Sequence, residues 1–309
     1  MVAVLQGFGL IAVVVAVGWL LAHTGLFGEA EQRMLAKLTF WVGSPALLFL
    51  VISRADVGVV FSGFLVATIA GVVVASAAYM LLAWLVWRRS ATDVLMGGMT
   101  VAYVNSNNLG VPIAAYVLGD ASLAAPMLLF QLLLLQPAWL AALDLAGGAG
   151  GAGADRRRML LRPLANPLTI GSLLGVLVAL TGPRLPGAVI DPIELIAGLA
   201  IPGMLLAFGI SLRLSPRPGS GGTGPELAAV VLAKLALMPL VTALTALYLL
   251  DLDRATVLAA TVIAALPTAQ NVFILAVTYG RAVRLARDGV FVTTLLAFPA
   301  MLLTVWLLG

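Results

Sequence analysis

Apolar runs of roughly 20 residues, separated by short polar or charged stretches, repeat along this 309-residue chain. A helix rises about 1.5 Å per residue, so a run of this length crosses the ~30 Å hydrocarbon core of a bilayer. Only 10% of the residues are charged, whereas soluble domains carry about 25%. The pattern predicts an all-α integral membrane protein.

Ten apolar segments can be separated along the chain. They cover residues 2–22, 34–52, 58–87, 94–118, 122–143, 163–181, 190–212, 227–250, 255–279 and 288–308. Thirteen of the 17 basic residues follow the odd-numbered segments. Because basic residues gather on the cytoplasmic side, both termini are expected on the outer side of the membrane.

Composition also excludes several classes of function. The basic balance (pI about 9.8) comes from residues at membrane edges, so it does not indicate a nucleic-acid partner. The chain has no cysteine and a single histidine, His23, at the end of the first segment. We therefore predict no disulfide, no metal site and no enzymatic activity.

Two of the apolar segments contain unusual polar clusters. The fourth reads "NSNNLGVPIAAY" and brings together Asn105, Ser106, Asn107, Asn108, Gly110 and Pro112. The ninth reads "LPTAQNVF" and brings together Pro267, Thr268, Gln270 and Asn271. Proline removes a backbone donor and clashes with the preceding turn, so both segments are expected to break or kink.

The two halves of the chain share these features in corresponding places. The second segment contains "SPALLFLVIS" (Ser44–Ser53), and the seventh contains "IPGMLLAFGIS" (Ile201–Ser211). Five segments is an odd number, so the second half must run through the membrane in the opposite sense. We predict a 5+5 inverted repeat with crossed, broken fourth and ninth helices, in which a flexible linker (144–162) joins residues 1–143 to 163–309. The alternative is that the prolines only kink helices and the amides only join them.

The predicted crossing contains no Asp or Glu, which disfavours proton–cation antiport. Amide donors and the positive ends of half-helices suit an anion instead. The expected binding residues are Asn105, Ser106, Asn107, Asn108, Thr268, Gln270 and Asn271, with Gly110, Pro112 and Pro267 shaping the broken helices. Lys234, inside the eighth segment, is either a charge partner or a side chain that snorkels to the cytoplasmic interface.

Three motifs carry a resemblance to a known family. They are "NSNNLGVPIAAYVLGD" (Asn105–Asp120), "LPTAQNVFILAVTYG" (Leu266–Gly280) and "AKLALMPL" (Ala233–Leu240). The chain resembles a bacterial member of the auxin efflux carrier family, to which the plant PIN-type auxin exporters belong. The resemblance implies a fold similar to sodium/proton antiporters and bile-acid symporters.

The resemblance also implies a function. Similar proteins export small organic anions by an elevator-like movement, here carboxylates such as malonate, malate or indole-3-acetate. Residues 1–56 and 163–214 would form a scaffold, through which two copies dimerise, and residues 57–143 and 226–309 a transport domain. The expected location is the bacterial inner membrane. No cofactor is expected, although the alternative, a sodium-coupled symporter of the bile-acid type, would bind sodium.

Overall fold

The computed structural model describes residues 2–54, 63–147, 167–182, 185–214 and 224–309. These residues form helices and contain no β-strand, only one isolated antiparallel bridge. This confirms the all-α class. Most of the predicted linker 144–162 lies outside the described residues, as do the beginnings of the segments predicted at 58–87 and 163–181.

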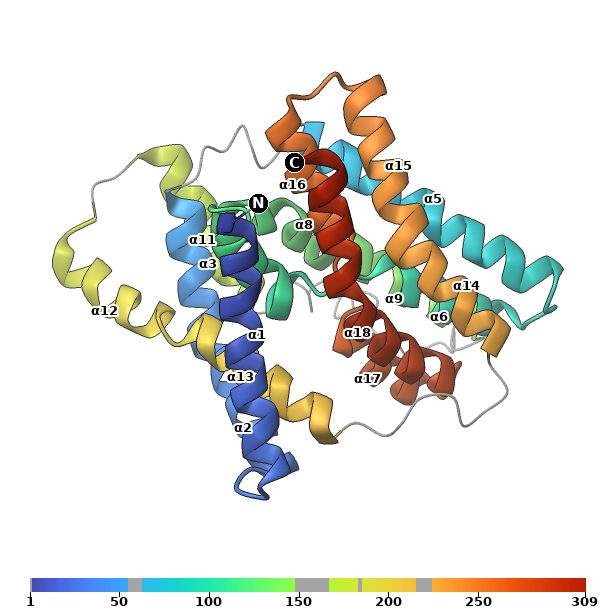
Figure 1. Cartoon of the computed structure of the whole chain (residues 1–309), viewed down its shortest axis with the longest axis horizontal. Coiled ribbons are helices and arrows are strands. Elements are labelled where there is room, and N and C mark those ends of the chain that lie inside the picture. Colours follow the sequence, from blue (N-terminus) through green and yellow to red (C-terminus); the bar gives the residue numbers. More distant parts are fainter. Residues whose placement is uncertain (1, 55–62, 148–166, 183–184, 215–223) are drawn as a thin grey trace. The chain divides into compact units, whose positions relative to one another are not determined.

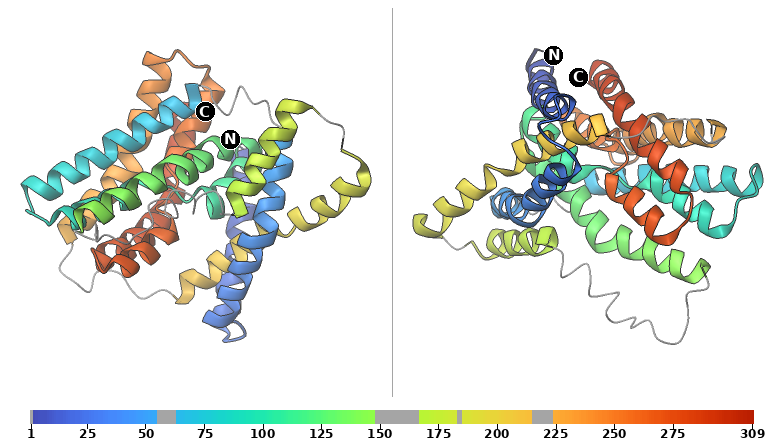
Figure 2. Two further views of the ribbon diagram at one scale, coloured as in Figure 1. Left: turned by 180° about the vertical axis from the view of Figure 1, so that it is seen from behind. Right: turned by 90° about the horizontal axis from the view of Figure 1, so that it is seen from below.

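The chain forms two compact units, each assembled from three stretches of sequence (Figures 1 and 2). The first unit comprises Met1–Phe61, Asn107–Leu133 and Arg157–Pro216. Its helices are α1 (Val2–His23), α2 (Glu29–Leu38), η1 (Thr39–Gly43), α3 (Ser44–Ser53), α7 (Val111–Tyr116), η3 (Ala121–Ala124), α8 (Ala125–Phe130), α11 (Pro167–Thr181), α12 (Gly187–Ala197) and α13 (Ala200–Leu214), with most of η2 (Ser106–Gly110) and η4 (Gln131–Leu135).

The second unit comprises Ser62–Ser106, Leu134–Arg156 and Arg217–Gly309. Its helices are α5 (Gly63–Leu85), α6 (Ala91–Ala102), α9 (Gln136–Ala146), α14 (Gly224–Leu232), η6 (Ala233–Leu237), α15 (Met238–Leu244), η7 (Thr245–Leu249), α16 (Arg254–Ala264), α17 (Gln270–Tyr279) and α18 (Val283–Leu308). Within this unit α5 runs beside α15 (Figure 1).

Six helical stretches among the described residues are long and apolar enough to cross a membrane. They are Glu29–Ser53, Gly63–Leu85, Ala121–Ala146, Gly187–Leu214, Gly224–Leu249 and Val283–Leu308. The segments predicted at 94–118 and 255–279 do not form continuous helices of this length, because each is interrupted: α6 ends at Ala102 and α16 at Ala264.

Prolines widen four of the described helices instead of breaking them. The π-helical segments η1, η2, η4 and η6 each end two residues before a proline, and these prolines are Pro45, Pro112, Pro137 and Pro239. Proline cannot donate to the carbonyl four residues back, and its ring pushes that carbonyl away. One widened turn relieves the clash while the helix continues. The chain therefore stays helical through Pro112, from Ser106 to Tyr116.

Glycines allow close helix packing in the first unit, where α1 packs against α13 and α3 against α11 (Figure 1). A Cβ atom on Gly209 would overlap the backbone carbonyl of Val15, and one on Gly18 would overlap that of Leu206. Small residues of this kind let helix backbones approach in lipid, where dispersion replaces the hydrophobic effect as the main attraction.

We expect Gly209→Ala to destabilise the protein, because its methyl group must force α1 and α13 apart. Overpacking of this kind costs about 1–3 kcal/mol. Gly9→Ala is the matched control on α1, because a Cβ atom there meets nothing within 4 Å. Thermal unfolding in detergent should show a lower midpoint for Gly209→Ala alone. Equal midpoints for the two variants would contradict the packing described.

Candidate functional site

Two helix interruptions meet in the second unit, and we call their residues, Tyr103–Asn105 and Pro267–Ala269, the crossing. Val104 and Thr268 form the antiparallel bridge. The Asn105 N–H donates to the Pro267 carbonyl at 2.8 Å, and the Ala269 N–H donates to the Tyr103 carbonyl at 3.2 Å. Peptide groups released from two helices thus satisfy each other, which matters where no water can replace the lost bonds.

Thr268 ties the crossing to two neighbouring helices. Its hydroxyl donates to the Thr100 carbonyl of α6 at 2.7 Å. Its backbone N–H donates to the Thr293 hydroxyl of α18 at 3.1 Å, and that hydroxyl in turn donates to the Gly289 carbonyl at 2.7 Å. All three threonine side chains are fully buried. The crossing is therefore held by side chains as well as by backbone.

A second set of polar side chains lies on the other side of Tyr103. The Tyr103 hydroxyl donates to Gln136 Oε1 of α9 at 2.8 Å and is also hydrogen-bonded to the Asn271 side chain. Because the hydroxyl proton goes to Gln136, the Asn271 amide must be the donor in the second contact. This leaves Asn271 Oδ1 buried, with no hydrogen-bond partner among the described residues.

The structure brings some of the predicted site residues together in the second unit. Asn105, Ser106, Pro267 and Thr268 are buried at the crossing, and the Ser106 N–H donates to the Val104 carbonyl at 2.8 Å. Gln270 and Asn271 follow in the first turn of α17 and are partly buried.

The remaining predicted residues of the fourth segment belong to the first unit. Asn107 and Asn108 are partly buried, and Asn107 Nδ2 donates to Asn108 Oδ1 at 3.0 Å. Gly110 and Pro112 are buried in the helical run Ser106–Tyr116. The interruption of the fourth segment thus lies at Tyr103–Asn105, upstream of Pro112, whereas Pro267 lies inside the interruption of the ninth.

Sequence reasoning did not find three of the residues that hold the crossing: Thr100, Gln136 and Thr293. Each lies in a predicted apolar segment and forms its bond with an element distant in sequence. The Gln136–Pro137 dipeptide and the Thr293–Thr294 pair were nevertheless readable signals, because polar residues inside an apolar span need partners.

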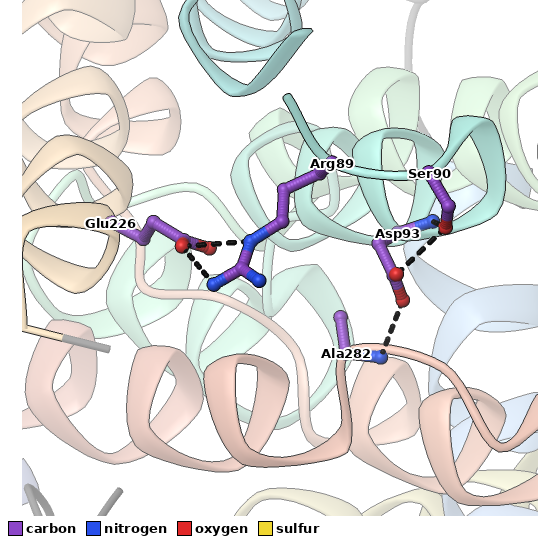
Figure 3. Close-up of polar contacts among 5 residues, drawn as sticks. All are labelled: Arg89, Ser90, Asp93, Glu226 and Ala282. Carbon is purple, nitrogen blue, oxygen red and sulfur yellow. Dashed lines mark hydrogen bonds and ion pairs between the residues drawn. The ribbon is translucent and has the colours of Figure 1, made fainter. Parts of the chain in front are cut away.

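Polar contacts join residues at the beginnings of α6, α14 and α18 in the second unit (Figure 3). Arg89, before α6, forms an ion pair with Glu226 of α14, with Nε 2.9 Å from Oε1. Asp93 accepts hydrogen bonds from the Ser90 hydroxyl (2.7 Å) and the Ala282 N–H (3.2 Å). We call Arg89, Asp93, Glu226 and Ala282 the end clasp. The hydrogen bond that Arg89 donates to the Glu226 carboxylate raises the pKa of Arg89 above its ordinary value.

Lys234 is the charged residue of the predicted site, and it is completely buried. It lies in η6, the widened turn before Pro239, and its Nζ atom lies 3.4 Å from the sulfur of Met238. Met238 is four residues further along the chain, at the beginning of α15. This complete burial favours the charge-partner alternative, and both alternatives stay predictions.

We expect Thr293→Val to destabilise the crossing, because it leaves the buried Thr268 N–H without an acceptor. Such a loss costs about 1–3 kcal/mol. Thr304→Val, also on α18, is the matched control, because its hydroxyl only donates to the Ala300 carbonyl of its own helix. Hydrogen exchange should report faster exchange of the Thr268 amide in Thr293→Val, and unchanged exchange would refute the contact.

Comparison with known proteins places this geometry in context. Residues 5–142 and 156–307 match the family described as "Membrane transport protein". A protein of Rhizobium meliloti (strain 1021) named "Putative malonate transporter" is 28% identical over 301 residues, which cover 95% of this chain and 91% of that protein. An "Uncharacterized transporter" of Methanothermobacter thermautotrophicus is 28% identical over 211 residues, covering 66% of each chain. The chain therefore belongs to the membrane transport protein family, the auxin efflux carrier family that its motifs resemble.

Proposed function

We propose that this membrane transporter is a secondary carrier that exports small organic anions, with dicarboxylates of the malonate class as the first candidates. The observation that carries the proposal is the crossing itself. Two interrupted helices lie side by side in the buried interior of the second unit, surrounded by amides and hydroxyls. The residues of the crossing include no carboxylate that would repel an anion.

The elements around the crossing offer donors to an anion. Helix α17 begins directly after the crossing, so the positive end of its dipole lies there. Gln270 and Asn271 add side-chain amides in the same turn. Lys234, buried in the same unit, would supply the compensating charge.

The relative from Rhizobium meliloti supports the choice of a dicarboxylate, because that protein is named a malonate transporter. A dianion of this size presents two carboxylates a few ångströms apart. In our proposal one is bound by the amides at the crossing and the other by the Lys234 ammonium.

We also propose that the ten apolar segments form the 5+5 inverted repeat and work by an elevator movement. The contacts within the first unit support the repeat: α1 packs on α13 and α11 on α3, which are segments 1 with 7 and 6 with 2. Both contacts depend on glycines, since Cβ atoms on Gly171 and Gly175 would crowd the carbonyls of Pro45 and Phe49. Exchanging the two halves exchanges these pairs, as an inverted repeat requires.

In this proposal the transport domain (57–143 and 226–309) carries the crossing, and the scaffold (1–56 and 163–214) joins two copies into a homodimer. The protein would lie in the bacterial inner membrane with both termini outside. The charge distribution supports this orientation, because Arg88, Arg89, Arg281, Arg284 and Arg287 all fall in loops or helix starts on the predicted cytoplasmic side.

We expect Asn105→Ala and Asn271→Ala each to weaken malonate binding by about tenfold or more, because each loses a hydrogen bond to a charged group, worth about 1.5–3 kcal/mol. Gln32→Ala removes the amide of a residue on α2 of the first unit that is not one of the predicted binding residues, and it serves as control. Titration calorimetry on the purified protein provides the measurement. If affinity for every organic acid that the wild-type protein binds survived both changes, the site assignment would be wrong.

A second candidate function is sodium-coupled symport, and a separate observation favours it. Asn271 Oδ1 and Thr294 Oγ1 are buried, and neither has a hydrogen-bond partner among the described residues. They lie on α17 and α18, which pack together. Neutral oxygens left without donors suit a hard cation such as sodium, which interrupted helices commonly coordinate.

Sodium coupling predicts that malonate transport into proteoliposomes rises when a sodium gradient is imposed. It also predicts that Thr294→Val raises the sodium concentration needed for half-maximal transport, because one ligand is lost. Thr304→Val provides the control on the same helix. Transport at the same rate with and without sodium would exclude this second candidate and leave the first intact.

A further inference from the structure

Lys234 is a buried lysine, and the proposed function does not say what balances its charge when no anion is bound. It is 0% exposed, and in the part of the chain that the structure describes it forms no ion pair. Its one neighbouring acceptor is a thioether sulfur, a weak acceptor for an ammonium group. Burying an unpaired ammonium ion in an apolar interior is costly, so burial favours the neutral amine over the ammonium form.

Three helices of the second unit relate the position of Lys234 to that of the crossing. Helices α6, α14 and α18 all begin at the end clasp, where Glu226 meets Arg89 and Asp93 meets the Ala282 N–H (Figure 3). These contacts align the starts of the three helices. Positions along them can therefore be compared by counting turns from the clasp.

The three helices touch again at Gly289 of α18. A Cβ atom there would lie 2.8 Å from Thr100 Cγ2 on α6 and 3.5 Å from Val230 Cγ1 on α14. Four residues further along, α18 reaches Thr293, whose hydroxyl accepts from Thr268 of the crossing. Four residues beyond Val230 lies Lys234. Lys234 is therefore level with the crossing, and η6, which carries it, packs against both α6 and α18.

Other titratable groups of the neighbouring elements do not compensate this charge. Helix α15 carries none, and α5, α6, α14 and α18 carry Tyr79, Asp93, Glu226, Arg284, Arg287 and Asp288. Glu226 pairs with Arg89, Asp288 pairs with Arg287, and Asp93 is bound to Ser90 and Ala282. Counted along their helices, these carboxylates lie at least one turn before the level of Lys234.

We propose that Lys234 takes up one proton from the surrounding solution when a dicarboxylate binds at the crossing, so that the carrier moves each dianion together with a proton. This inference rests on the proposed function. In the empty site the neutral amine avoids a buried charge. A bound carboxylate supplies the missing counter-ion, so the amine accepts the proton and becomes the ammonium partner of the anion.

The consequence for transport is a smaller charge movement. A dianion bound to a protonated Lys234 crosses with one negative charge in excess, and the empty site returns without charge. Release of the anion returns the proton to the solution on the other side. Proton and dianion therefore travel in the same direction, with no titratable carboxylate required at the crossing.

The test measures proton exchange during malonate binding to the purified full-length protein. Titration calorimetry in two buffers with different ionisation enthalpies gives the number of protons taken up. We expect up to one proton per malonate, and an affinity that falls by up to about tenfold per pH unit as the solution becomes more alkaline. Lys234→Arg, which stays charged, should bind malonate without proton uptake.

Two further variants complete the experiment. Lys234→Met should lose proton uptake and bind malonate at least tenfold more weakly, with thermal unfolding reporting whether it folds. Lys37→Met, which removes the other lysine of the chain, from α2 in the first unit, should behave as wild type. Proton uptake by Lys234→Arg equal to that of the wild type would overturn the assignment to Lys234.

The experiment separates a failure of the Lys234 proposal from a failure of the proposed anion transport. Malonate binding without proton exchange in the wild-type protein would overturn the role of Lys234 and leave anion transport standing. If neither malonate nor other organic acids bind, the proposed function fails and the inference falls with it. Neither outcome depends on a variant that might not fold.

Discussion

The hydrogen bonds of the crossing are the contacts on which the rest of the second unit depends. In hydrocarbon, an interrupted helix is stable only if the freed N–H and C=O groups find partners inside the protein. Here two interruptions supply partners for each other, through Asn105 with Pro267 and Ala269 with Tyr103. One interruption alone would leave these groups unsatisfied. The two polar clusters in the sequence are therefore one structural feature, and the helices around them are arranged to keep both stretches in register.

Much of the fold could be predicted from the sequence, because in a membrane protein hydropathy alone places the helices. Among the described residues the apolar runs fall on helices, and the fourth and ninth segments are both interrupted, the fourth at Tyr103–Asn105 and not at the expected Pro112. The details that failed concern proline. The sequence shows Pro112 and Pro267 alike, but a proline breaks a helix only where the freed groups gain better partners elsewhere. Pro267 lies beside the fourth segment and gains them, whereas Pro112 is accommodated by one widened turn.

The sequence indicated which types of residue form the candidate site, but it identified only some of the individual residues. Asn105, Thr268 and Asn271 stood out because amides and hydroxyls are rare in apolar segments. Thr293 and Gln136 were missed, since their role depends on which helices pack together, and no local pattern gives that packing. The depth of Lys234 was equally hidden. A lysine stem reaches about two turns, so the sequence alone could not show that the Lys234 ammonium group is buried beside Met238.

The widened turn at η6 also decides how one long helix serves two sets of neighbours. An extra residue in a turn rotates everything beyond it by about 100° relative to a regular helix. Before the turn, α14 faces α18 and α6, and after it, α15 faces α5 and α16. The widened turn before Pro239 thus rotates the following part of the helix, so that a single apolar span presents two differently oriented faces without a loop. Lys234 lies in this widened turn, which contacts helices from both sets of neighbours, α6 and α18 on one side and α5 on the other.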